Sequence, residues 1–320
     1  MRVFTFLLLE ILLAPLTLTS LLLLQLWVLT SSQQQQISMT ALAPLFCRWI
    51  LHLQGIRNDP TTQALVDSLP YFSSALCWGA VGPTLFAANL TSYTPSFLNV
   101  PPVGKENISN MIYTRSLFFD RAITQYLPTA EQIVLLGAGF DTRLFNFCLG
   151  QGRALFEVDQ PATQQAKIQA LRESGADLSE VSFVSVDFNQ ENWADKLLKA
   201  GFEPGKRSFF LWEGVTYYLS EAIVKETLLK VAEMSGRGST IAFDVFSPTF
   251  ISATKEWQWI QPAIKILDLI GEPFRFGIGI QNDILITQLL QDAGFQIQTF
   301  QPMGNTHKPP FGGLITASKQ

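Results

Sequence analysis

The stretch QIVLLGAGFDTR, residues 132–143, decides the fold class of this 320-residue chain. Its first half is a short apolar run of the kind that forms a buried strand. Gly137 and Gly139 follow at once, and glycine lets the backbone turn sharply and approach a ligand closely. Thr142 stands where the dinucleotide motif G-x-G-x-x-G has its third glycine, so a pyrophosphate group fits poorly. The stretch therefore predicts a strand, a ligand-binding turn and a helix.

The alternation of apolar runs and amphipathic segments continues downstream. Further strands are expected at residues 154–159, 181–187, 209–213 and 239–245, and helices after Pro161 and at 193–200, 220–235 and 283–293. Two final apolar runs, 295–300 and 314–318, have no helix between them and must pair antiparallel, because a parallel link needs a long crossover. We expect an α/β fold with a doubly wound, seven-stranded sheet, mostly parallel with an antiparallel C-terminal strand.

Upstream of the sheet, the chain is mainly helical and apolar in pattern. Breaks are expected at Asp59-Pro60, Pro70 and Pro83, and a loop at residues 100–104. The expected division is a hydrophobic leader or membrane anchor over residues 1–36 and one domain over 38–320, made of an N-terminal helical cap (38–105) and a core (106–320).

The leader has no charged residue from Ile11 to Thr30, which is long enough to cross a hydrocarbon core of about 30 Å as a helix. Glu10 weakens the wider apolar run, and Pro15 would kink the helix. Three alternatives stay open. The leader is an uncleaved anchor, or a cleaved signal peptide, for which no A-x-A-like site follows, or it is not made because Met39 is the true start.

Composition excludes several classes of function. Lys plus Arg number 22 against 26 Asp plus Glu, for a net charge of −4, and no basic cluster occurs, so we expect no nucleic-acid partner. Cys47, Cys77 and Cys148 lie far apart and the two histidines stand alone, so we expect no metal site. The chemistry must then depend on carboxylates, backbone amides, hydroxyls and a bound cofactor.

Acidic residues end the expected strands one after another. Asp159 stands 22 positions after Gly137, where an acidic residue accepts hydrogen bonds from ribose hydroxyls in doubly wound folds, and Glu157 shares its strand face. Either carboxylate could instead complement the positive end of the following helix. The carboxyl ends of parallel strands meet at one edge of a sheet, so these side chains should gather there.

The next two strands end in the same way. Asp187 could accept the amine of an adenine while Phe188 packs on the base, although Asp187 could equally cap the following helix. Glu213 ends the fourth strand, and Tyr217 and Tyr218 come soon after, either as core residues or as the wall of an acceptor site. Four successive strand ends therefore carry glycine, acid, acid and acid.

Five motifs carry a family resemblance. They are YTRSLFFD (113–120), LLGAGFDTR (135–143), FEVDQP (156–161), VDF (186–188) and WEGVTYYL (212–219). Together they resemble the leucine carboxyl methyltransferase family, in particular its bacterial branch of S-adenosylmethionine-dependent methyltransferases. TALAPLFCRW (40–49), the Asp-Pro pair at 59–60 and EPFRFGI (272–278) extend the likeness to roughly residues 38–318.

The resemblance implies a class I methyltransferase-like fold with S-adenosyl-L-methionine as cofactor. It implies that Arg115 grips the methionine carboxylate, Gly137 passes beneath it, Asp159 binds the ribose, Asp187 and Phe188 bind the adenine, and Glu213 binds the amino-acid end. A planar guanidinium suits a carboxylate because it matches both oxygens. A further cofactor-contacting lysine of the family has no clear counterpart here.

Methyl transfer from a sulfonium requires alignment and exclusion of water rather than covalent help. A carboxylate acceptor needs no general base, whereas a hydroxyl does, and the candidate bases would be Glu213, Tyr217 and Asp244. The shortage of histidine favours a carboxylate, or an acidic hydroxyl, on a small molecule or a chain terminus. The alternatives are an NAD-dependent oxidoreductase and a non-catalytic, membrane-tethered module that binds the cofactor.

The cofactor also bears on location. Arg2 alone favours a cytoplasmic N-terminus, and a spanning helix would then put the domain outside, away from its cofactor. We expect a cytoplasmic-facing domain with membrane attachment through residues 11–30, or a cytoplasmic protein if Met39 is the true start.

Overall fold

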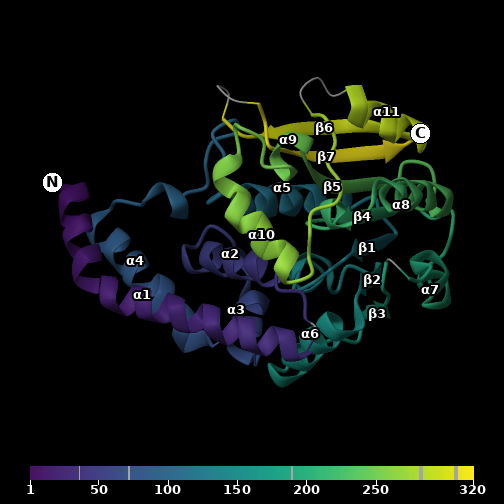
Figure 1. Ribbon diagram of the computed structural model, residues 1–320. Helices are drawn as coiled ribbons and strands as arrows, with labels where there is room; N and C mark the ends of the chain where they lie inside the picture. The colour runs from purple at the N-terminus through teal and green to yellow at the C-terminus, as the bar shows by residue number, and fades with distance from the viewer. Residues whose placement is uncertain (36, 71–72, 189, 281–283, 306–308) are drawn as a thin grey trace.

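The computed structural model describes residues 1–35, 37–70, 73–188, 190–280, 284–305 and 309–320. Its centre is a seven-stranded sheet in the order β3-β2-β1-β4-β5-β7-β6 (Figure 1). The strands are β1 (Gln132–Leu136), β2 (Ala154–Asp159), β3 (Val181–Ser185), β4 (Ser208–Trp212), β5 (Thr240–Phe246), β6 (Phe295–Met303) and β7 (Gly312–Lys319). Strands β1 to β5 pair in parallel, and β7 pairs antiparallel with both β5 and β6. The expected sheet is confirmed.

Helices cover both faces of this sheet. One face packs on α7 (Trp193–Lys199), α8 (Glu221–Met234) and α11 (Ile284–Asp292), through residues such as Leu197, Leu228 and Leu290. The other face packs on α5 (Met111–Tyr126), through Phe119 and Ile123. Successive side chains of a strand point to opposite faces, so the apolar β1 run supplies Val134 to the first core and Ile133 to the second.

The helix expected directly after β1 is not a regular α-helix. Five residues, Leu144–Cys148, form a short π-helix, η2, instead. Asp141 and Arg143, just before it, are drawn into buried ion pairs, and Gly150, at a φ of +71°, turns the chain away directly after it. Buried charge in the turn therefore takes the place of a helix N-terminus at this point.

The N-terminal part is helical, as expected. It contains α1 (Arg2–Gln35), α2 (Leu42–Leu53), α3 (Pro60–Ser68), α4 (Ser74–Thr91) and the 3₁₀ turn η1 (Ser96–Leu98). Asp59 caps α3 by accepting a hydrogen bond from the amide of Thr62 at 2.9 Å, with Pro60 at the first helical position. The break expected at Pro83 is wrong, because α4 continues through it.

Helices α1 and α4 lie side by side at the left of Figure 1, beside the rest of the molecule. In the described part of the chain, one helix is long and apolar enough to cross a membrane, over Arg2–Val28. Only 11% of its most apolar window is buried inside the molecule. The remaining helices, α6 (Pro161–Glu173), α9 (Pro248–Ile251) and α10 (Gln261–Leu269), belong to the sheet domain, and α10 has no fully buried residue.

Candidate functional site

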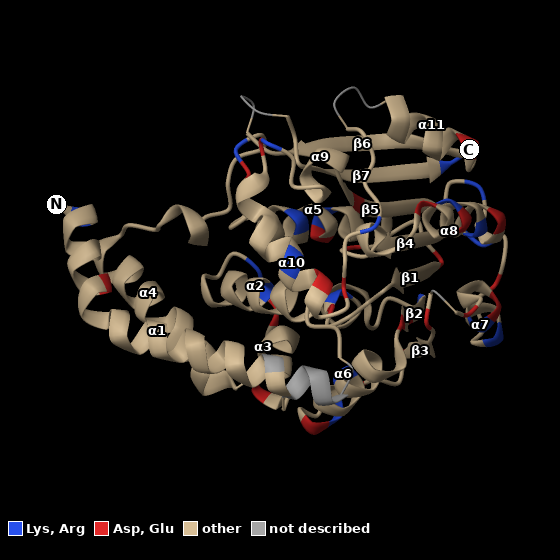
Figure 2. Ribbon diagram, in the orientation of Figure 1, with Lys and Arg blue, Asp and Glu red and all other residues tan. Residues whose placement is uncertain are grey.

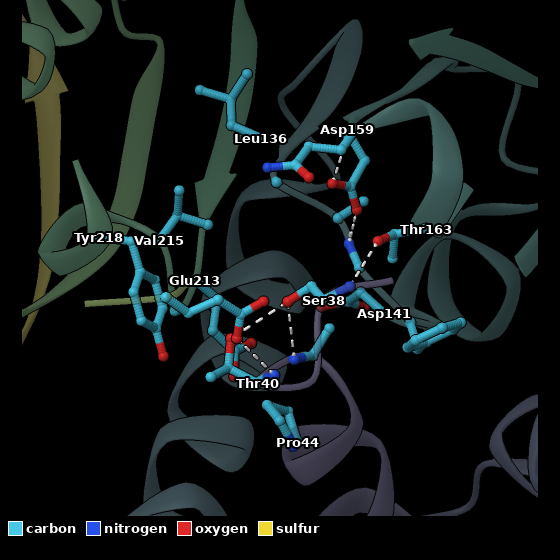
Figure 3. Close-up of a pocket in the computed structure, with 18 of the residues that line it drawn as sticks. Ser38, Thr40, Pro44, Leu136, Asp141, Asp159, Thr163, Glu213, Val215 and Tyr218 are labelled. Atoms are coloured by element: carbon cyan, nitrogen blue, oxygen red, sulfur yellow. Dashed lines mark hydrogen bonds between the residues drawn. The ribbon is translucent and has the colours of Figure 1, made fainter. Parts of the chain in front are cut away.

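A cavity of about 230 Å³ lies at the carboxyl ends of β1, β2 and β4 (Figure 3). Its walls include the glycine turn at 137–141, the ends of β2 and β4, Arg48 of α2, Arg115 of α5, and two segments that close over them, 38–44 and 271–275. Figure 3 shows Asp159 on one side of the cavity and Glu213 and Tyr218 on the other. This is the sheet edge where doubly wound folds bind ligands.

The glycine turn touches its neighbours closely. Gly137 has a φ of +66°, and a Cβ atom added there would lie 2.4 Å from Cγ2 of Val215. Gly139 has a φ of +48°, so both glycines hold a conformation that other residues rarely adopt. Only glycine at position 137 lets the turn lie against the segment after β4.

Asp159 ends β2 and lines the cavity. Its carboxylate accepts hydrogen bonds from the amides of Gly139 and, at 2.6 Å, of Gln160. Burial raises the pKa of Asp159 to about 6, although these two amides act to lower it. The side chain is thus fixed at the rim of the turn with its carboxylate directed at the glycine backbone.

Glu157 shares a strand with Asp159 but takes no part in the cavity lining. Both of its oxygens accept from Lys167 Nζ at 2.7 Å, and the pair is buried beneath the glycine turn. Burial raises the pKa of Glu157 to about 7, against the effect of Lys167. Of the two acidic residues at the end of β2, only Asp159 can reach a ligand.

Arg115 projects from α5 into the same cavity. Its Nε donates to Glu213 Oε1 at 2.9 Å, and its Nη1 donates to the Tyr217 hydroxyl at 2.9 Å and to Asp244 at 3.3 Å. Within the described residues, Nη2 has no hydrogen-bond partner. One edge of the guanidinium is therefore fixed by the protein, and one nitrogen remains for a ligand.

Glu213, directly after β4, is surrounded by arginines. Arg143 Nη1 donates to its Oε2 at 2.5 Å, Arg115 holds its other oxygen, and Arg48 Nη1 lies 3.9 Å away. Burial alone would raise the pKa of Glu213, but the three arginines together lower it. Glu213 is therefore an ionised carboxylate on the cavity wall.

Arg48, on α2, is a cavity residue that the sequence interpretation missed. It is buried, its Nη2 donates to the Phe140 carbonyl at 3.1 Å, and its Nη1 lies 3.6 Å from Asp141. Its Nε is buried and has no hydrogen-bond partner among the residues that the structure describes. A signal was present, because Arg48 is the one Lys, Arg, Asp or Glu between Ser38 and Ile56, and a charge in an apolar helix requires a partner.

Asp141 and Arg143 anchor the floor of the site. Arg143 is fully buried and forms ion pairs with Asp120, Asp141 and Glu213. Although burial opposes both shifts, the attraction within this cluster raises the pKa of Arg143 and lowers that of Asp141. Both groups are charged, and their role is to hold the turn and Glu213 in place.

Phe188 lines the cavity at the end of β3, while Asp187 is not among the lining residues. The backbone carbonyl of Asp187 accepts from the amides of Gln190 and Glu191, so residue 187 starts a turn. The helix cap considered for Asp187 falls to Asn192, whose side chain accepts from the amide of Ala194. Five of the six expected site residues therefore line one cavity. The exception is Asp187, which directly precedes Phe188 in the chain.

The acceptor side differs from what the sequence suggested. Tyr217 and Tyr218 line the cavity, with ring centroids 4.8 Å apart. Asp244 is fully buried behind Arg115 and is not a lining residue, so it has no access to a ligand. The remaining lining residues on this side come from segment 271–275, which includes Glu272 and Arg275. Among the described residues, no cluster of His, Cys, Asp and Glu could hold a metal ion.

Comparisons with known proteins find a matching family model. The family model described as Leucine carboxyl methyltransferase matches residues 83–232. This range contains all five motifs that carried the resemblance, which is thereby confirmed. The motifs at 40–49 and 272–278 lie outside the match, so it is shorter than the expected range of 38–318.

Two relatives illustrate the similarity. A protein of Parafrankia sp. is 35% identical over 170 residues, 51% of this chain and 53% of the relative. A protein of Bacillus subtilis is 32% identical over 170 residues, 52% of this chain and 55% of the relative. Both are named "Putative S-adenosyl-L-methionine-dependent methyltransferase". This chain thus spans about half the length of the curated relatives it matches, and the cofactor in their names is the one expected from the sequence.

A solved structure is also similar. Magnesium protoporphyrin IX methyltransferase of Synechocystis, solved with bound SAH, aligns with a TM-score of 0.42 and 15% identity, over 68% of this chain and 90% of that one.

Proposed function

Since residues 83–232 match the family model of leucine carboxyl methyltransferase, we propose that this chain is an S-adenosyl-L-methionine-dependent methyltransferase. The observation that supports this most is the convergence of Arg115, Gly137, Asp159 and Glu213 on one cavity. These residues come from three strand ends and a helix, and each has the chemistry that one part of this cofactor requires. When bound, the cofactor supplies an activated methyl group on a positively charged sulfur.

The charge of the site fits this ligand better than a dinucleotide. Asp141, Asp159 and Glu213 all line the cavity, and Glu213 and Asp141 are held ionised by arginines. Such carboxylates favour an ammonium and a sulfonium but repel a pyrophosphate. A pyrophosphate would also lack the helix N-terminus that normally binds it, because only the short η2 follows the turn. This argues against the NAD-dependent alternative.

Each residue then has a proposed role. Asp159 accepts hydrogen bonds from the ribose hydroxyls, Phe188 packs on the adenine with Asp187 beside it, and Gly137 lets the ligand approach the turn. Glu213 holds the ammonium of the amino-acid end. Two cations are available for the carboxylate of that end, the free Nη2 of Arg115 and the unpartnered Nε of Arg48. Arg48 thus takes the place of the lysine for which the sequence shows no counterpart.

We further infer that the methyl acceptor is a carboxylate, because none of the three bases considered for a hydroxyl acceptor suits that role. Burial raises the pKa of Tyr217 well above its usual value despite Arg115 beside it, so the phenol stays protonated at neutral pH. The arginines around Glu213 lower its pKa and make it a weak base, and Asp244 does not line the cavity. Arg275 lines the rim, and its side chain has no ion pair among the described residues, so it can attract an anionic acceptor. The acceptor is a small molecule or a chain terminus.

Calorimetric titration of the full chain with S-adenosyl-L-methionine, its demethylated product and NAD tests the cofactor. We expect the first two to bind and NAD to give no signal, and the reverse result would refute the proposal. Transfer of a radiolabelled methyl group to carboxylic acids in a cell extract, with alkali-labile product, tests the reaction. Binding without any transfer would support the alternative of a non-catalytic module.

A further inference from the structure

Helices α1 and α4 form an antiparallel pair along almost the whole length of α4. At one end, the ring of Phe6 lies 5.0 Å from that of Tyr93. At the other end, Trp27 Nε1 donates to the Pro70 carbonyl at 3.0 Å. A Cβ added at Gly79 would lie 2.2 Å from Ser20 Oγ, so the two backbones approach closely there. Close approach through small residues is typical of helix pairs in membranes.

Glu10, the charged residue that interrupts the apolar run of the leader, lies between these two helices. Glu10 belongs to a stripe of α1 residues that face α4, and its Oε2 accepts from the buried Thr84 hydroxyl at 3.2 Å. The members of this stripe are Phe6, Glu10, Leu13, Thr17, Ser20 and Leu24, spaced by three and four positions. Glu10 is therefore directed at the partner helix, as is usual for an ionisable residue at membrane depth.

The free sides of the pair are mostly apolar. The exposed residues of α1 include Leu8, Leu12, Leu18 and Leu22, and those of α4 include Trp78, Phe86 and Leu90. No Asp, Glu, Lys or Arg occurs in α4. Figure 2 shows the charges of the molecule on the other elements and almost none on this pair. A second copy of the chain would cover one side only, whereas lipid covers every free side, so lipid fits this surface better.

The return of the chain from α4 limits how deep the pair can enter. Leu98, seven residues after Thr91, is buried against Trp49 in the N-terminal core, and its carbonyl accepts from Gln54 Nε2. Seven extended residues reach at most about 25 Å, less than a hydrocarbon core of about 30 Å. The end of α4 and the end of α1 that packs on it therefore cannot lie across a bilayer from α2.

We propose that α1 and α4 together bind a lipid bilayer from one side, as a monotopic pair lying along the membrane. The N-terminus and the domain then share the cytoplasmic side. Arg2 favours a cytoplasmic N-terminus, and a spanning α1 would then put the domain outside. In a monotopic arrangement this conflict is absent, because Arg2 and the domain both stay on the cytoplasmic side. This proposal concerns the helix pair and does not depend on the methyltransferase activity.

Topology is the first test. The full chain is expressed in a bacterial host with a protease-cleavable tag at each end, and protease is added to spheroplasts and to inverted membrane vesicles. We expect both tags to be cleaved in the inverted vesicles and both to be protected in spheroplasts. Cleavage of the two tags from opposite sides would show that α1 spans the membrane and would overturn the proposal.

Flotation with vesicles of phosphatidylcholine and one quarter phosphatidylglycerol is the second test. Leu90→Asp places a charge on the free side of α4, and we expect it to lower the partition of the full chain into vesicles about tenfold or more. Leu229→Asp is the matched control, because Leu229 on α8 is also exposed (45%, against 63% for Leu90), and this variant should float as the wild type does. Unchanged flotation of Leu90→Asp would mean that α4 takes no part. A wild-type chain that stays unbound and runs as a dimer would identify a second copy as the partner.

Discussion

The guanidinium of Arg115 donates from Nε to Glu213 Oε1 at 2.9 Å, which joins helix α5 to the end of strand β4. The pair brings a cation and an anion to the same cavity wall, as a ligand with both an ammonium and a carboxylate requires. Arg48 adds a second cation from α2. The amino-acid end of the proposed cofactor would therefore meet three charged side chains from three separate segments.

The carboxylate of Asp159 should decide ribose binding. Asp159→Ala is expected to lower the affinity for S-adenosyl-L-methionine by roughly tenfold to a hundredfold, since a hydrogen bond to a charged group contributes about 1.5–3 kcal/mol. Calorimetric titration measures this, with circular dichroism to confirm that the variant folds. Asp177→Ala, at an exposed loop position, is the control. Wild-type affinity in the Asp159 variant would refute its role.

Arg48 should recognise the carboxylate of the cofactor. We expect Arg48→Met to weaken binding of S-adenosyl-L-methionine but to leave binding of its decarboxylated analogue nearly unchanged. Arg48→Lys should recover part of the loss, because the positive charge returns without the planar fork. If the Met variant weakens both ligands equally, Arg48 supports the structure of the turn and does not contact the carboxylate.

Cofactor affinity should depend on pH through Asp159, whose pKa burial raises to about 6. Ribose hydroxyls donate to the ionised carboxylate, so affinity should fall as the pH drops below about 6, by up to tenfold per pH unit. Asp159→Asn should remove this dependence, while Glu157 remains in both proteins as an internal control.

The same shift makes the free protein less stable as the pH rises from about 4 to 6, because the native carboxyl of Asp159 then holds a proton that the unfolded one has lost.

Gly137 should tolerate no side chain. Gly137→Ala is expected to destabilise the fold by about 2–4 kcal/mol, from its positive φ and from the collision with Val215. Gly175→Ala is the matched control. Gly175 also has a positive φ, of +77°, but a Cβ added there would meet none of the described atoms within 4 Å. This substitution should therefore cost only the conformational part, about 1–2 kcal/mol. Chemical denaturation measures both. Adding Val215→Ala should recover part of the Gly137→Ala loss, and its failure to do so would exclude the collision.

Removal of α1 should separate binding of the cofactor from behaviour in solution. A chain that begins at Ser38 keeps every residue that lines the cavity, so we expect unchanged cofactor affinity. It also uncovers the side of α4 that packs on α1, so we expect it to aggregate without detergent. Light scattering and calorimetry check the two expectations. Loss of cofactor binding in detergent would show that α1 shapes the cavity.

Local patterns were sufficient for most of the sheet. Apolar runs and turn residues predicted all seven strands to within a few residues, because buried strands must be apolar and glycine must stand where the chain turns. The positions of Gly137 and Asp159 could be predicted for the same reason, since both stand at strand ends. Their roles toward the cofactor stay predictions.

Tertiary packing decided what the sequence interpretation missed. Arg48 lies 92 positions before Phe140, whose carbonyl it binds, and no local pattern connects them. Pro83 was expected to break a helix, but packing against α1 outweighs its propensity. Segments 38–44 and 271–275 close over the pocket, although both lie far in sequence from the strand ends that form its base.

Full burial of Arg143 has a consequence for how the molecule folds. Asp120 compensates its charge and also forms an ion pair with Arg57, in the segment just before α3. Asp59, which precedes α3, accepts a hydrogen bond from the Thr142 hydroxyl at 2.8 Å. The helical cap and the sheet domain are therefore connected by one chain of buried ions, and breaking it would leave a charge uncompensated at a cost of about 3–5 kcal/mol. The cap is not an exchangeable module, and both parts should unfold together in a single cooperative transition.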